Sequence, residues 1–143
     1  MNRSDESAEM DSVIRPRLDL TDEQVNKLCD TIRENCFGLH KFLGSGFREK
    51  VYERGVIHRL TKAGLKVQPQ ARVKIFDEDG TELIEEFMDL VVEDVLIIEL
   101  KAVKETSSAD VAQLLGYLKA TGFRHGLLIN FGAPVFYIKK YVR

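Results

Sequence analysis

The chain has 143 residues, of which 44% are hydrophobic and 31% are charged, and its formal net charge at pH 7 is −2. This length fits about one domain with its own core, and the composition excludes a disordered chain. No apolar run approaches the roughly 20 residues that span a bilayer. The opening residues MNRSDESAEMDS lack the apolar stretch of a secretory signal, so we expect a cytoplasmic protein without a membrane partner.

Residues 1–17 are polar and acidic and show no periodicity, which predicts a flexible tail ahead of a single domain at residues 18–143. The segment 21–24 (TDEQ) matches a capping box. Apolar residues at helical spacing then predict a helix of about 16 residues. Its Cys29 and Cys36 lie about two turns apart, too far for a disulfide, so we expect both to be reduced residues of the core.

Helical spacing resumes at residues 47–62 after the break Gly44-Ser45-Gly46. Alternation of apolar and polar residues predicts strands at 65–75 and 83–92, joined by a turn at 77–80. The strongly apolar segment 95–103 is expected at the centre of the sheet.

Ser107 or Ser108 can cap a helix that runs to about Ala120. A buried strand at 126–130 and an alternating strand at 135–142 complete the order helix, helix, three strands, helix, two strands. This order predicts an α/β fold. The last strand alternates Phe136, Ile138 and Tyr141, so it could form an edge on which two copies pair into a homo-oligomer.

Ionisable residues interrupt the apolar strands at Asp89, Glu99 and Lys101. Side chains alternate across a strand, so Glu99 and Lys101 share one face. Asp89 joins them only if the loop between the strands has an odd number of residues, because a shift of one residue moves a side chain to the other face. We predict a three-residue loop at 93–95, which pairs position 89 with 99 and position 91 with 97.

Asp89 and Glu99 side by side would offer the hard oxygen ligands that suit Mg²⁺ or Mn²⁺, and a lysine beside them can orient water. Two carboxylates that bind a metal ion, with a lysine beside them, are groups that can catalyse phosphodiester hydrolysis. The alternative interpretation is a solvent-facing strand with ordinary ion pairs, because E-x-K is a common string.

Two further pairs of residues lie at helical spacing. Gly46, Glu49 and Tyr52 form G-x-x-E-x-x-Y, and Glu49 and Tyr52 are three residues apart on one helix face. Gln113 and Tyr117 are four residues apart on the later helix, which can direct an amide and a phenol at a common target. Each motif by itself has an ordinary interpretation: a surface Glu next to a partly buried Tyr at a helix start, and a helix face that packs against the sheet.

Together these motifs resemble the G-x-x-E-x-x-Y proteins, a group placed in the PD-(D/E)XK nuclease superfamily. The resemblance runs from about Leu20 to Val142 and is most specific at residues 43–52, 89–101 and 113–132. The proline of the superfamily's name is absent, since Met88 precedes Asp89, but proline supplies no ligand.

The resemblance implies a restriction-endonuclease-like αβββαβ core with a mixed central sheet flanked by helices. It also implies that Asp89 and Glu99 bind Mg²⁺ or Mn²⁺ with the Leu100 carbonyl, that Glu49 reaches in from its helix, and that Lys101 positions the attacking water. Gln113 and Tyr117 match a Q-x-x-x-Y element that supports such a site, and Tyr52 completes the candidate set. If the three carboxylates converge, each pair about 5 Å apart costs roughly 3 kcal/mol, which a divalent cation would offset.

The implied activity is that of a magnesium-dependent phosphodiesterase, a nuclease acting on nucleic acid, with DNA as the expected polymer. Residues 1–24 hold three Arg against seven Asp and Glu, a net of −4, which leaves +2 for residues 25–143, so we expect modest and salt-sensitive affinity. Two alternatives remain: a non-catalytic nucleic-acid-binding or partner-binding module with the nuclease fold, and an unrelated α/β protein whose ion pairs face solvent.

Overall fold

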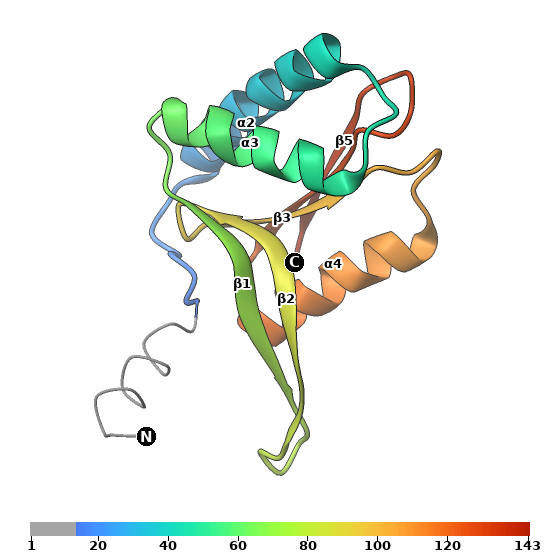
Figure 1. Cartoon of the computed structure of the whole chain (residues 1–143). Helices are drawn as coiled ribbons and strands as arrows, with labels where there is room; N and C mark the ends of the chain where they lie inside the picture. The colour runs from blue at the N-terminus through green and yellow to red at the C-terminus, as the bar shows by residue number, and fades with distance from the viewer. Residues whose placement is uncertain (1–13) are drawn as a thin grey trace, which may run out of the picture.

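The computed structural model describes residues 14–143, and the chain order of its elements is the predicted one. These residues form three helices and five strands (Figure 1): α2 (Asp22–Leu43), α3 (Glu49–Lys62), β1 (Val67–Phe76), β2 (Glu82–Val92), β3 (Leu96–Lys101), α4 (Ser108–Thr121), β4 (His125–Asn130) and β5 (Tyr137–Val142).

The five strands form one sheet in the order β1-β2-β3-β4-β5, so β3 is central and β5 lies at an edge, as predicted. All neighbours are antiparallel except β3 and β4, which run parallel because α4 carries the chain across the sheet between them. Helices α2 and α3 cover one face and α4 covers the other (Figure 1). The predicted mixed sheet flanked by helices is confirmed.

Each face of the sheet has its own apolar core. The first core packs the buried faces of α2 and α3 on β3 and β4, and it contains both cysteines as buried free thiols. The second core packs α4 on the opposite face, around Leu114, Leu118 and Phe123. Residues Leu96, Ile97 and Ile98 of β3 alternate between the two cores, which explains why this strand is apolar throughout.

The loop between β2 and β3 has the predicted three residues, since Val91 pairs with Ile97 and Val92 with Leu96. Glu93 and Asp94 both have φ of 54°, and Val95 donates back to the Val92 carbonyl. Positive φ at both central residues is the conformation of a type I′ turn.

The ladder between β2 and β3 ends at the pair Leu90–Ile98, before Asp89 and Glu99 are reached. On the other side of β2, the ladder with β1 is interrupted at Gln70 and Asp89, between the pairs Pro69–Leu90 and Ala71–Met88, and Gln70 has φ of 50°. Met88 packs in the second core whereas Leu90 packs in the first, although strict alternation would give them the same face. The β1–β2 hairpin therefore twists at Gln70 and Asp89, and its outer half runs away from β3 (Figure 1).

Two boundaries differ from the prediction by more than two residues. Helix α2 is longer than predicted and ends at Leu43, because Leu39 and His40 continue its buried face and Gly44, with φ of 69°, ends it. The predicted tail at 1–17 overlaps the domain at its end: Ile14 is buried in the second core, and the Arg17 amide donates to the Asp94 carbonyl at 2.7 Å. Residues 1–13 lie outside the described residues.

In the part of the chain that the structure describes, no helix has the combination of length and hydropathy needed to cross a bilayer.

Candidate active site

Where the β2–β3 ladder ends, the side chains of Asp89 and Glu99 accept hydrogen bonds from main-chain amides. The Leu100 amide donates to Asp89 Oδ2 at 2.8 Å, and the Asp89 amide donates to Glu99 Oε1 at 3.2 Å. These side-chain bonds replace main-chain bonds, so the two strands separate without leaving their amides unpaired. Asp89 and Glu99 therefore lie together in the structure, as predicted. They lie where β2 and β3 separate beyond the pair Leu90–Ile98, and we call this place the opening of the sheet.

The Leu100 carbonyl belongs to this opening as well. In a strand, the N–H and C=O of one residue point toward the same neighbouring strand. The Leu100 amide meets Asp89 on the β2 side, whereas the Lys101 carbonyl accepts from Phe131 on the β4 side. The Leu100 carbonyl thus faces the carboxyl groups.

Burial and mutual repulsion govern how the two carboxyl groups ionise. Glu99 is only 3% exposed, and burial together with the charge of Asp89 raises its pKa to about 9. Burial also raises the pKa of Asp89, against a lowering by the hydrogen bond from Leu100. Burial and the neighbouring charge therefore both favour the protonated form of Glu99.

Helix α3 brings two further carboxylates toward this pair. Burial raises the pKa of Glu49, and the charge of Asp89 raises it further while Lys101 lowers it, so Glu49 lies within electrostatic reach of both. Glu53, which the sequence analysis did not single out, is 6% exposed and also raises the pKa of Asp89. Its position four residues after Glu49, on the same helix face, is the pattern that could have identified it.

Gln70 is a second residue that the sequence analysis missed. Its Nε2 donates to Glu53 Oε1 at 3.1 Å. In β1, Gln70 lies between Pro69 and Ala71, which pair with the two neighbours of Asp89. Its left-handed backbone turns the side chain out of the strand alternation and toward α3. No pattern in the sequence marks this residue, because its placement depends on the twist of the hairpin.

Lys101 lies on the α4 side of the opening. Its Nζ donates to Gln113 Oε1 at 3.4 Å and is 3.7 Å from Asp110 Oδ1. Gln113 Nε2 donates to the Tyr117 hydroxyl at 3.3 Å, and that hydroxyl donates to Glu86 Oε2 at 3.0 Å. The predicted pair Gln113 and Tyr117 thus forms a chain of hydrogen bonds that ends on Lys101.

Tyr52 has a different place from the other candidate residues. Its hydroxyl donates to the Gly44 carbonyl at 2.6 Å and accepts from the Phe47 amide at 3.3 Å. Its ring is fully buried and stacks on Phe131 with a centroid distance of 4.8 Å. Tyr52 therefore holds the loop that contains Gly46 and leads into α3, and it acts on the site through the position of Glu49.

The donor chemistry of these residues fits a hard divalent cation such as Mg²⁺ or Mn²⁺. Within residues 14–143, no three His, Cys, Asp or Glu side chains stand together as a ready metal cluster. One oxygen of Asp89 and one of Glu99 accept from main-chain amides, which leaves each carboxyl a second oxygen. Carboxylates that raise one another's pKa by repulsion are the groups that a divalent cation stabilises.

Residues 26–143 match the family model of the PD-(D/E)XK nuclease superfamily. The chain belongs to this superfamily. Its members are nucleases that generally use divalent metals, so the membership supports a nuclease-like function and the hydrolase class. The matched segment contains the acidic and basic residues of the sheet opening and the Q-x-x-x-Y helix.

No curated protein matches the chain. Among solved structures, one titled "Crystal structure of SSO0001" is similar in fold, with a TM-score of 0.52 and 13% identity. The similarity covers 66% of this chain and 49% of that one, so it spans about half of the other protein. At this identity the similarity concerns the fold alone, and it agrees with a restriction-endonuclease-like arrangement.

Proposed function

We propose that this superfamily member is a divalent-metal-dependent nuclease of the G-x-x-E-x-x-Y group that hydrolyses phosphodiester bonds in DNA. One observation carries the proposal: at the opening of the sheet, the charge of Asp89 raises the pKa of both Glu49 and Glu99, while Lys101 lowers the pKa of all three carboxyl groups. Perturbed carboxyl groups of this kind are typical of functional sites rather than of surface ion pairs.

Asp89, Glu99, Glu49 and the Leu100 carbonyl are the groups that would hold Mg²⁺ or Mn²⁺, which when bound supplies charge neutralisation and Lewis acidity toward a phosphate. Main-chain amides fix the orientation of the first two carboxyl groups before any ligand arrives. Such prior positioning lowers the reorganisation needed during reaction.

Lys101 would hold the attacking water and stabilise the negative charge that develops on the phosphate. Its ammonium group lies 3.4 Å from Gln113 Oε1 and 3.7 Å from Asp110 Oδ1. The hydrogen-bond chain through Gln113 and Tyr117 to Glu86 fixes the amide to which that ammonium group is bonded.

A second candidate is a binding module that keeps the fold without a useful catalytic rate. It is favoured by the main-chain bonds that Asp89 and Glu99 already make and by the lack of a ready three-ligand cluster within residues 14–143.

Cleavage assays separate the two candidates. Labelled single-stranded and duplex DNA are incubated with Mn²⁺ and either the wild type or Lys101→Ala, with Lys104→Ala as the control for a loss of charge nearby. Cleavage by the wild type and by the control, reduced at least about a hundredfold in Lys101→Ala, supports the nuclease. Binding by all three proteins without cleavage by any would establish the binding module instead.

A further inference from the structure

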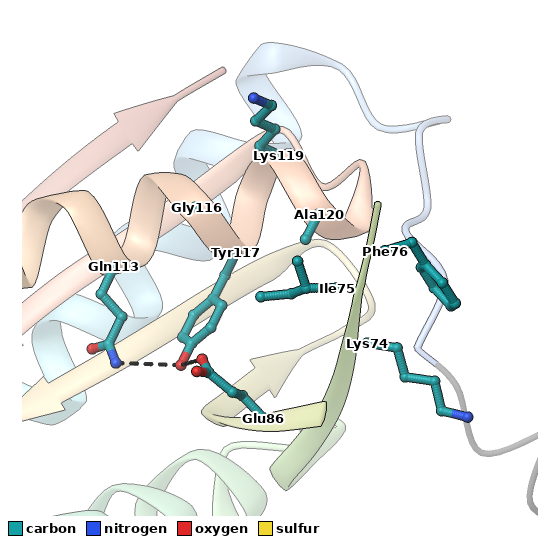
Figure 2. Close-up of a pocket in the computed structure, with 9 residues that line it drawn as sticks. All are labelled: Lys74, Ile75, Phe76, Glu86, Gln113, Gly116, Tyr117, Lys119 and Ala120. Atoms are coloured by element: carbon teal, nitrogen blue, oxygen red, sulfur yellow. Dashed lines mark hydrogen bonds between the residues drawn. The ribbon is translucent and has the colours of Figure 1, made fainter. Parts of the chain in front are cut away.

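A pocket of about 610 Å³ lies beside the candidate active site, between α4 and the outer half of the β1–β2 hairpin. Figure 2 shows Ile75 of β1 facing Tyr117 and Ala120 of α4 across it, with Glu86 and Gln113 at its polar end. The volume falls in the range of small-ligand sites, which is about 300–1,000 Å³. The pocket is therefore large enough for one planar group with an apolar wall and a polar end.

Gly116 lines this pocket from the middle of α4, where glycine costs a helix roughly 0.5–1 kcal/mol relative to alanine. Gly55 of α3 has a packing reason, because a Cβ there would lie 2.8 Å from the Leu39 side chain. A Cβ at Gly38 of α2 would lie 2.8 Å from the end of the Arg59 side chain, which is flexible and can move. A Cβ at Gly116 would meet nothing within 4 Å. Packing within the chain therefore does not require glycine there, and a larger side chain at this position would extend into open space.

The pocket is continuous with the candidate site through two side chains. Gln113 and Tyr117 line it, and Gln113 also accepts the hydrogen bond from Lys101. A polymer whose phosphate lies at Lys101 therefore has its neighbouring unit next to the pocket.

Lys74 and Lys119 flank the pocket and direct their side chains outward (Figure 2). Lys74 is paired with Glu82 at 3.2 Å in an exposed contact, which contributes little and leaves the lysine free to turn. Two cations around a cavity with an apolar wall complement an anionic backbone that carries flat rings.

On these observations, and resting on the proposed nuclease function, we propose that the pocket binds one unstacked base of a single DNA strand whose adjacent phosphate lies at Lys101. The base would lie against the wall formed by Ile75, Gly116 and Ala120, and the Glu86 carboxylate would accept a hydrogen from its exocyclic amino group. A base inside a duplex is stacked and paired and cannot enter, so single-stranded DNA is the preferred substrate.

Binding is measured in Ca²⁺, which has the same oxygen ligands, with short oligodeoxynucleotides that carry the fluorescent base 2-aminopurine. The chain contains no Trp, which keeps the protein background low. Wild type is compared with two variants that fill the pocket, Gly116→Leu and Ala120→Leu, and with Ala112→Leu, which adds the same bulk to an exposed position of α4 outside the pocket.

We expect the wild type to bind the single strand more tightly than the duplex and to change the fluorescence of the base. The pocket-filling variants should lose about tenfold in single-strand affinity, which corresponds to part of one base-stacking interaction, while Ala112→Leu binds like the wild type. Unchanged binding in both pocket-filling variants, with circular dichroism showing that they are folded, would overturn the proposal.

Cleavage in Mn²⁺ distinguishes this failure from that of the proposed function. If the wild type binds and perturbs the base but cleaves nothing, the pocket assignment stands and the nuclease proposal falls. If the wild type cleaves single strand and duplex equally, and both filled variants do the same, the pocket assignment falls and the nuclease proposal stands.

Discussion

The Asp89 amide donates to the Glu99 carboxylate at 3.2 Å, at the position where the β2–β3 ladder would otherwise continue. One residue thus ends a strand pairing and contributes a carboxyl group to the opening that results. The fold and the candidate site depend on the same contact, so substitutions here act on stability and on ligand binding together.

Divalent cations should stabilise the protein. Mg²⁺ or Mn²⁺ at millimolar concentration is expected to raise the melting temperature by several degrees, because a cation that binds the native state alone shifts unfolding by mass action. Asp89→Ala should abolish the rise, measured by thermal denaturation with metal and with chelator. The exposed Asp30→Ala is the control, and an equal rise in the two variants would contradict the assignment of Asp89 as a ligand.

Without metal, the pKa of Glu99 makes stability depend on pH. Its pKa is about 9 in the native state against 4.5 as the ordinary value, so the native state holds a proton that the unfolded chain has lost. Stability should therefore fall as pH rises from about 5 to 9, by at most about 1.4 kcal/mol per pH unit. Urea denaturation in chelator at pH 5, 7 and 9 measures this slope. Glu99→Gln should flatten it, and parallel slopes would exclude a buried proton on this residue.

Tyr52 should contribute through the loop before α3. Tyr52→Phe keeps the stacking on Phe131 but leaves the Gly44 carbonyl without its 2.6 Å donor, so we expect a loss of about 1–2 kcal/mol in the free energy of unfolding. The metal-induced rise in melting temperature should persist. Tyr141→Phe, on the edge strand, serves as the control, and a Tyr52→Phe protein as stable as the wild type would show that the hydroxyl does not hold the loop.

Gly116→Ala should stabilise the protein by roughly 0.5–1 kcal/mol, because alanine restricts the unfolded chain and the added methyl group meets no atom within 4 Å. Denaturation midpoints of the variant and the wild type check this. The same change at Gly55 should destabilise, since its Cβ would lie 2.8 Å from Leu39. A destabilised Gly116→Ala would mean that the glycine is needed for folding rather than for an open pocket.

Both cysteines should resist alkylation in the native protein. Cys36 is 1% exposed and burial raises the pKa of its thiol to about 12, so little nucleophilic thiolate exists at pH 8. A thiol reagent is expected to react with neither cysteine in buffer and with both in denaturant. Rapid reaction in buffer would contradict the packing of α2.

The sequence predicted the elements and the register of Val91 on Ile97 between β2 and β3, because both depend on local patterns. Thr21 and Ser107 cap their helices as such residues usually do, and the spacing of ten between Asp89 and Glu99 fixed the loop length. The extension of α2 to Leu43 and the packing of Ile14 were missed, since both depend on contacts with distant segments.

The candidate site was predicted in its acidic and basic residues but not in their surroundings. Glu53 and Gln70 come together through the twist of the β1–β2 hairpin, which no short pattern specifies. Glu86 reaches Tyr117 only after that twist moves the outer hairpin toward α4. Tyr52 was predicted as a residue of the site, but in the structure its hydroxyl bonds to the loop before α3. The sequence does not specify this contact, because the direction of the hydroxyl depends on the conformation of that loop.

Anomalous diffraction from crystals soaked in Mn²⁺ tests the central claim most directly. The proposal predicts a peak within about 2.5 Å of oxygens from Asp89 and Glu99, at the opening between β2 and β3. A Mn²⁺ peak held by other residues, with the Asp89 and Glu99 side chains still bonded only to the amides of Leu100 and Asp89, would contradict it.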